Sequence, residues 1–146
     1  MISLEAGLGK AFVCRMEFES DFLESLKEFA KEHKIKAAFF IALGAVKKAS
    51  FAYYEQASKK YVEESVDEPM ELLSCVGNFA TLEGDVAVHA HAVFSNRAGK
   101  ILGGHLLKGT IIFAGEVLIF ELSGVNLVRT YDNLTGLNLY TPHPKG

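Results

Sequence analysis

The chain has 146 residues, about the length of one ordinary domain, and it is 49% hydrophobic and 23% charged. This balance is typical of a globular protein and excludes intrinsic disorder. The formal net charge of −3 excludes a protein that binds nucleic acid through bulk positive charge alone. No segment contains the roughly 18 consecutive apolar residues of a membrane-spanning helix, so we expect no membrane partner.

Cysteine usage indicates the cellular compartment. The two cysteines, Cys14 and Cys75, do not form a Cys-x-x-Cys motif, which excludes a zinc–thiolate knuckle and a disulfide framework. Cys75 lies in an apolar window, and we interpret it as a core residue rather than a nucleophile. The first residues lack the apolar run of a signal peptide. Together these features predict a cytoplasmic protein.

The first element expected in chain order is a helix that starts after Ser20 or Asp21. Either residue can cap its N-terminus, and Asp21 with Glu24 has the spacing of a capping box. Apolar residues then recur with the helical period and form one stripe, and basic residues suit the C-terminal end of the helix dipole. The candidates for an alternative role in nucleic-acid binding are Lys27, Lys31, Lys34, Lys36, Lys47 and Lys48.

After the helix, the apolar pattern changes to a period of two or to continuous apolar runs, which indicates strands. Gly44 lies inside the first of them and marks a bulge or a close approach of two backbones. We expect polar turns at residues 47–48, 56–60 and 95–100, and a hairpin around residues 114–115. The strands predicted between these turns cover residues 37–46, 49–55, 61–66, 70–82, 85–94, 106–113, 116–122, 125–130 and 136–140.

One helix among many strands predicts an α+β fold, a curved antiparallel sheet of about seven strands with one main flanking helix. We expect a single domain over residues 1–146, with a short polar tail from about residue 141. Several strands are apolar on both faces, whereas one helix covers only one face of such a sheet. The uncovered face is expected to be a protein interface, which predicts an obligate homo-oligomer in the form of a closed ring.

The most informative feature is a group of three histidines within 17 residues. His89 and His91 alternate along an apolar strand, so both imidazoles leave the same face, from backbone positions roughly 7 Å apart. His105 follows a turn and the Gly103–Gly104 pair, so a hairpin would return it to the first two. Three neutral histidines with an open position form the ligand set of a catalytic-type zinc site, and imidazole also suits Ni, Cu, Co and Fe(II).

Other interpretations of these histidines stay open. They could instead bond to one another, to the backbone and to solvent at a subunit boundary. A metal-dependent hydrolase or lyase is a further possibility, because a metal-bound water becomes a nucleophile near pH 7 where substrate reaches it. The sequence does not decide whether the protein is an enzyme, and it does not mark the fourth ligand clearly. The carboxylates considered for that role are Glu71, Glu83, Asp85 and Glu116, and the two remaining histidines, His33 and His143, are expected at the surface.

A resemblance to a known family rests on the histidine segment, HAHAVFSNRAGKILGGHL. With MELLSCVGNFA before it and KGTIIFAGEVLIFEL after it, this segment resembles the PPC domain, the "plants and prokaryotes conserved" family. The resemblance extends from about residue 12 to residue 140. Its most specific part is the pattern formed by His89, His91, Gly99, Gly103, Gly104, His105 and Leu106.

The resemblance implies an antiparallel sheet with a flanking helix, assembled as a homotrimer. In the histidine-bearing prokaryotic members it suggests a bound metal, zinc in the first place, and a biochemical role that is not defined. Plant members carry the domain beside AT-hook motifs in nuclear DNA-binding proteins. This chain has no Arg-Gly-Arg-Pro core of an AT-hook, so nucleic-acid binding is kept only as an alternative, and a small-molecule ligand is not identified.

Overall fold

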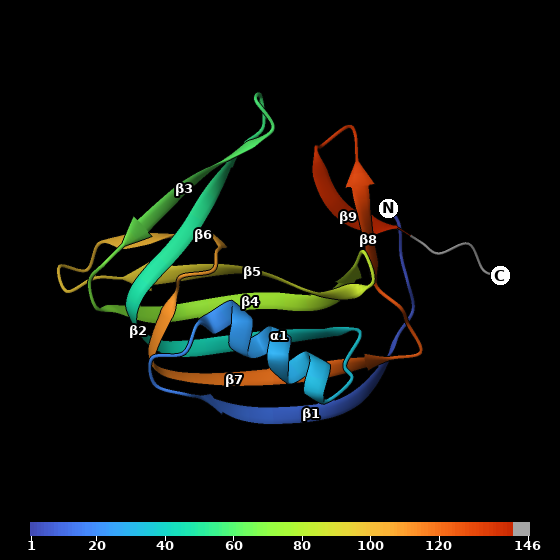
Figure 1. Cartoon of the computed structure of the whole chain (residues 1–146), viewed down its shortest axis with the longest axis horizontal. Coiled ribbons are helices and arrows are strands. Elements are labelled where there is room, and N and C mark those ends of the chain that lie inside the picture. The colour runs from blue at the N-terminus through green and yellow to red at the C-terminus, as the bar shows by residue number, and fades with distance from the viewer. Residues whose placement is uncertain (142–146) are drawn as a thin grey trace.

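The computed structural model describes residues 1–141, which form nine strands and one helix (Figure 1). The predicted α+β class with one main helix is confirmed, and the expected number of about seven strands is wrong. His143 and nearly all of the expected polar tail lie outside the described residues. The elements are β1 (Gly7–Met16), α1 (Phe22–Glu32), β2 (Ala38–Glu55), β3 (Lys60–Val66), β4 (Met70–Leu82), β5 (Asp85–Ser95), β6 (Ile101–Leu106), β7 (Ile111–Ser123), β8 (Val128–Asp132) and β9 (Leu137–Thr141).

The strand boundaries differ from the expected ones because two expected breaks do not exist and two strands were not expected. The lysines at residues 47–48 lie inside β2, where bulges bend the strand without ending it. Residues 114–115 lie inside β7, opposite Ala45 and Gly44. A Cβ on Gly44 would lie 2.2 Å from the carbonyl oxygen of Ala114, so these small residues mark two backbones in close contact rather than a turn. The strands that were not expected are β1 and β6.

Strand β2 connects the whole sheet because its two halves have different partners. Its first half pairs with β4 on one side and with β7 on the other, and its second half pairs with β3 and β6. Since β6 also pairs with β5, and β5 with β4, the strands β2, β6, β5 and β4 form a closed circuit. Figure 1 shows the second half of β2 turning away from β7 together with β3. All pairings are antiparallel except β4 with β8, which is parallel.

The helix α1 covers one face of the sheet. Asp21 caps it, because its Oδ1 accepts hydrogen bonds from the amides of Leu23 and Glu24, both at 3.1 Å. Phe22 is fully buried and packs near Phe40 of β2, with ring centroids 6.4 Å apart. With 11 residues and alternating polar positions, α1 is too short and too polar to cross a membrane, and it is the one helix in residues 1–141.

The opposite face of the sheet is apolar and uncovered in the single chain. Residues directly opposite one another on paired strands share a face. One residue from each of six neighbouring strands, each opposite the next, forms a row across this face. It begins on edge strand β1 and ends on β6, and its apolar members are 37% to 86% exposed. We call it the outer row, and its members in order are Val13, Leu118, Ile41, Val76, His91 and His105.

The glycine pair before His105 lets β6 lie between β5 and β2. A Cβ on Gly103 would lie 2.1 Å from the carbonyl oxygen of Ala92, and one on Gly104 would lie 2.5 Å from that of Ala52. No side chain fits at such distances, because both neighbours are backbone atoms of paired strands. This close approach sets the position of the strand that carries His105.

Replacing Asp21 with alanine is expected to destabilise the protein by about 2 kcal/mol. The change removes the helix cap and also the bond from the amide of Gly109 to Asp21 Oδ2, which is 2.6 Å long. Urea unfolding followed by circular dichroism measures the loss. The matched control, Asp67→Ala at an exposed carboxylate outside the elements, should change stability by no more than about 0.5 kcal/mol. Equal losses in both variants would refute the assigned role of Asp21.

The substitution Gly104→Ala is expected to cost about 3 kcal/mol, because the new methyl group overlaps a backbone oxygen that cannot move away without breaking the β2–β6 pairing. Gly99→Ala, in the turn of the same hairpin, also places alanine at a positive φ but meets nothing within 4 Å. It should therefore cost only about 1 kcal/mol. Denaturant titrations of both variants test the difference, and equal costs would contradict the close-approach explanation.

Candidate metal centre

The hairpin of β5 and β6 brings the three histidines together, as the sequence predicts. His91 pairs directly with His105 across the hairpin, and His89 lies two residues before His91 on the same face of β5. The turn is fixed by Asn96, whose side-chain oxygen accepts hydrogen bonds from the amides of Ala98 and Lys100, both at 3.0 Å.

The three imidazole rings lie close together. Their centroids are 5.0 to 5.4 Å apart, and one nitrogen from each ring lies within 4.8 Å of the other two. Tetrahedral ligands at Zn–N distances of about 2.1 Å are about 3.4 Å apart, so small rotations of the side chains bring these nitrogens to that spacing. His89, His91 and His105 are the only such group of His, Cys, Asp and Glu in residues 1–141.

His89 is held by a neighbour that the sequence did not reveal, Arg129 of β8. Arg129 Nη2 lies 3.3 Å from His89 Nδ1 and donates a hydrogen bond of 3.0 Å to Asn78 Oδ1 on β4. Burial, the positive charge of Arg129 and the two neighbouring histidines lower the pKa of His89 to about 4. The ring is therefore neutral at pH 7, which is the form that binds metals.

The ring of His105 gives the best evidence on whether a metal fits the site. Its Nδ1 is buried and has no hydrogen-bond partner among residues 1–141. Such an atom destabilises a fold unless something satisfies it, and a metal ion bound by this nitrogen would do so. Tyr61 of β3 packs against the ring with centroids 4.9 Å apart. Burial, together with His91 and Arg129, lowers the pKa of His105, so this ring is also neutral at pH 7.

None of the carboxylates considered from the sequence joins the cluster. Asp85 instead forms ion pairs with Lys27 and Lys31 of α1, at 2.9 and 2.8 Å, and these contacts hold its pKa well below the usual range. Glu71 lies at the opposite end of β4 and pairs with Ser95, and Glu116 lies on β7 opposite Arg15. Glu83 lies in the turn between β4 and β5. Within the part of the chain described here, the cluster thus consists of the three histidines alone.

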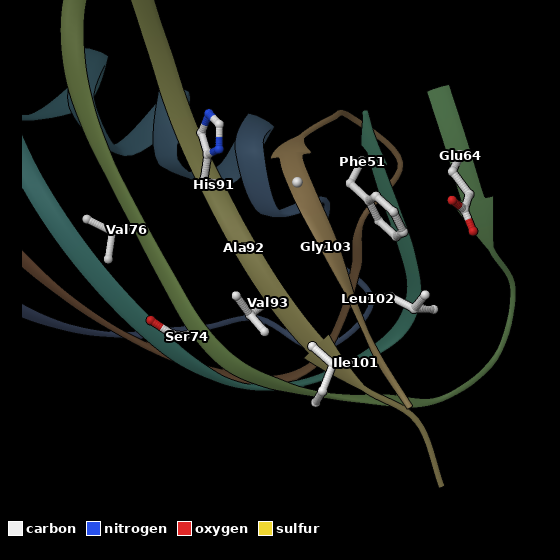
Figure 2. Close-up of a pocket in the computed structure, with 11 residues that line it drawn as sticks. Phe51, Glu64, Ser74, Val76, His91, Ala92, Val93, Ile101, Leu102 and Gly103 are labelled. Carbon is white, nitrogen blue, oxygen red and sulfur yellow. The ribbon is translucent and has the colours of Figure 1, made fainter. Parts of the chain in front are cut away.

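Two hollows reach the cluster. The first, of about 660 Å³, is bounded by His91 and by β3, β4 and β6, and Glu64 is the one carboxylate that lines it. Figure 2 shows His91 on β5 at one end of this hollow and Glu64 on the opposite side. The second, of about 320 Å³, touches the other two histidines. We call it the Arg129 hollow, and it is lined by Tyr61, Leu82, Ala87, Val88, His89, His105, Arg129, Gly136, Leu137, Asn138 and Leu139.

Sequence reasoning missed Tyr61, Asn78 and Arg129 as neighbours of the histidines. Asn78 could have been found, because it lies opposite His89 in the β4–β5 pair, whose strands were both predicted. Arg129 could not, because it reaches the site through the parallel pairing of β8 with β4, and no motif marks that contact.

Comparison with known structures agrees with the fold. A metal-containing protein from Archaeoglobus fulgidus is 36% identical with a TM-score of 0.93, and the match covers 97% of this chain and 100% of that one. A plant- and prokaryote-conserved (PPC) protein from Pyrococcus horikoshii is 28% identical with a TM-score of 0.90, covering 99% of each chain. A candidate DNA-binding protein from Bacteroides thetaiotaomicron is 24% identical with a TM-score of 0.83, covering 93% of this chain and 96% of that one.

The sequence comparisons place the chain in a family. The bifunctional protein GlmU from Synechococcus sp. is 25% identical over 135 residues, which are 91% of this chain, and the chain spans only 20% of the length of that relative. The profile of the Plants and Prokaryotes Conserved (PCC) domain matches residues 3–123, which include the outer row, the glycine pair and all three histidines. The chain therefore belongs to the Plants and Prokaryotes Conserved domain family.

Proposed function

We propose that this protein binds a divalent transition metal, zinc in the first place, through His89, His91 and His105. The observation that carries the proposal is the convergence of three imidazoles whose ligand nitrogens lie within 4.8 Å of one another. The metal-containing relative from Archaeoglobus fulgidus supports it. Imidazole suits zinc as well as nickel, copper, cobalt and iron, so the chemistry of the site restricts the metal to this group.

The competing explanation, a hydrogen-bonded histidine cluster, has less support. No hydrogen bond joins two of the three rings within residues 1–141, and the side-chain partner of His89 is Arg129. A cluster stabilised by mutual hydrogen bonds would not leave His105 Nδ1 buried and unpaired. A metal ion satisfies all three rings at once.

We further propose that the chain forms a homotrimer through the outer row. Val13, Ile41 and Leu118 are 86%, 43% and 37% exposed, and they line a hollow of about 570 Å³ on that face. An apolar surface that crosses the sheet in this way is typical of a protein interface, and a closed ring buries it in every copy. Because the same row ends at His91 and His105, the metal centre would lie beside this interface.

A cytoplasmic location is part of the proposal, supported by two free cysteines. Cys75 is buried, and burial raises the pKa of its thiol to about 12, which makes the thiol unreactive. This agrees with its interpretation as a core residue.

The alternatives of nucleic-acid binding and of a hydrolase or lyase stay predictions that no observation favours. The relative from Bacteroides thetaiotaomicron shares the fold, but half of the candidate basic residues are neutralised by carboxylates. Lys27 and Lys31 bind Asp85, and Lys47 binds Glu19.

For an enzyme, the three-histidine site would need an acid or base, and Glu64 is the carboxylate that lines an adjoining hollow.

The purified protein is expected to contain about one metal ion per chain, and His91→Ala should lose it. His91 is exposed, so its removal should leave the fold intact, whereas two remaining imidazoles bind a metal far more weakly than three. Elemental analysis by mass spectrometry measures the content. The control is His33→Ala, at an exposed histidine beyond the end of α1, which should keep its metal. A metal-free wild-type protein after incubation with zinc, nickel, cobalt and iron would refute the proposal.

The wild-type protein is expected to sediment at about three times its chain mass of 16.0 kDa, and Ile41→Glu should sediment as a monomer. A carboxylate in the middle of the outer row would be buried without a partner in the assembly. Leu134→Glu is the matched control, because Leu134 is 86% exposed in the turn between β8 and β9. A monomeric wild-type protein in analytical ultracentrifugation would contradict the predicted assembly.

A further inference from the structure

Arg129 is bound on several sides but has no counter-ion. Its Nη1 donates a hydrogen bond of 2.8 Å to the carbonyl oxygen of Asn138, and its guanidinium lies 4.4 Å from the ring centroid of Tyr140. Its Nη2 contacts Asn78 and His89. No carboxylate forms an ion pair with Arg129 among residues 1–141, and its Nε is buried without a hydrogen-bond partner there.

The residues around Arg129 do not supply the missing negative charge. No acidic residue lines the Arg129 hollow within residues 1–141, whereas His89, His105 and Arg129 all face it. A partly buried positive charge without a partner is costly, and a metal ion on the adjacent histidines would add positive charge. The hollow therefore has the electrostatic character of an anion-binding site.

The shape and lining of the hollow indicate which kind of anion it takes. Its volume of about 320 Å³ is at the small end of ligand-binding pockets. The apolar part of its lining, which we call the apolar wall, comes from Leu82, Val88, Leu137 and Leu139. Inorganic phosphate would leave this apolar wall uncovered, whereas an organic acid would place its carboxylate at Arg129 and its hydrocarbon part against the leucines.

We propose that the Arg129 hollow binds a small organic carboxylate, with Arg129 as the residue that recognises the carboxylate group. This inference deepens the proposed function, because it names the ligand class for the same histidine centre. The inference rests on the proposed function only in one respect, the positive charge that a bound metal would add. Arg129 and the apolar wall are part of the chain whether or not a metal is bound. Arginine suits the role because its guanidinium is always charged and a hydrogen bond from it to a carboxylate is stronger than one between neutral groups.

The test compares phenylacetate with phenylacetamide, which has the same shape and no charge. Isothermal titration calorimetry on the full chain should show phenylacetate binding at least about tenfold more tightly, the effect of one hydrogen bond between charged groups. Arg129→Gln should remove this preference, and Arg129→Lys should keep part of it because the charge remains. The control Arg97→Gln, at an exposed arginine in the β5–β6 turn, should keep all of it.

Three outcomes would overturn the inference. The first is equal affinity of the wild-type protein for the acid and the amide. The second is an unchanged preference in Arg129→Gln, which would mean that Arg129 only fixes the β8–β9 hairpin. The third is tighter Arg129-dependent binding of inorganic phosphate than of phenylacetate. Circular dichroism of each variant confirms that the fold is retained, and Arg129→Lys keeps the test decisive if Arg129→Gln does not fold.

The same titrations, with metal content measured separately, distinguish this inference from the proposed function. Metal bound at one ion per chain without any Arg129-dependent preference would overturn the carboxylate site and leave the metal centre. An Arg129-dependent preference in a protein that binds no metal would support the carboxylate site and overturn the metal centre.

Discussion

The structure depends on the contact between three backbones around β6. Gly103 and Gly104 bring this strand so close to β5 and β2 that a Cβ at either position would overlap a carbonyl oxygen. The contact closes the circuit of β2, β6, β5 and β4 and places His105 directly opposite His91. The position of His105 is thus set by the absence of side chains at the two residues before it, because only glycine permits that approach.

The outer row joins two kinds of side chain on one face of the sheet. Cross-strand neighbours share a face, so apolar residues on β1, β7, β2 and β4 are continued by histidines on β5 and β6. The apolar part of the row and the imidazoles next to it are therefore in contact through Val76 and His91. A change in how this face packs is therefore expected to change the positions of the histidine side chains, because only the β4–β5 pair separates them from the apolar part of the row.

Period and composition were sufficient to predict the α+β class, a helix capped by Ser20 or Asp21 and the histidine cluster, because each depends on residues near one another in sequence. The predicted strand boundaries were wrong where small or charged residues were interpreted as turns. Residues 47–48 form a bulge, and residues 114–115 lie against Gly44 in a paired strand. Arg129 was missed because its place beside His89 depends on a strand pairing distant in sequence, and local patterns do not encode such pairings.

The position of β7 has a consequence for how the chain folds. Strands β1 and β2 are separated by the helix in sequence but not paired with each other, since β7 lies between them in the sheet. Residues 7–16 consequently have no strand partner until residues near 111–123 have left the ribosome and returned to them. Such distant pairings slow folding, because the chain loses the entropy of closing a long loop before it gains any stabilising contacts. The N-terminal strand is therefore expected to be among the last to become ordered.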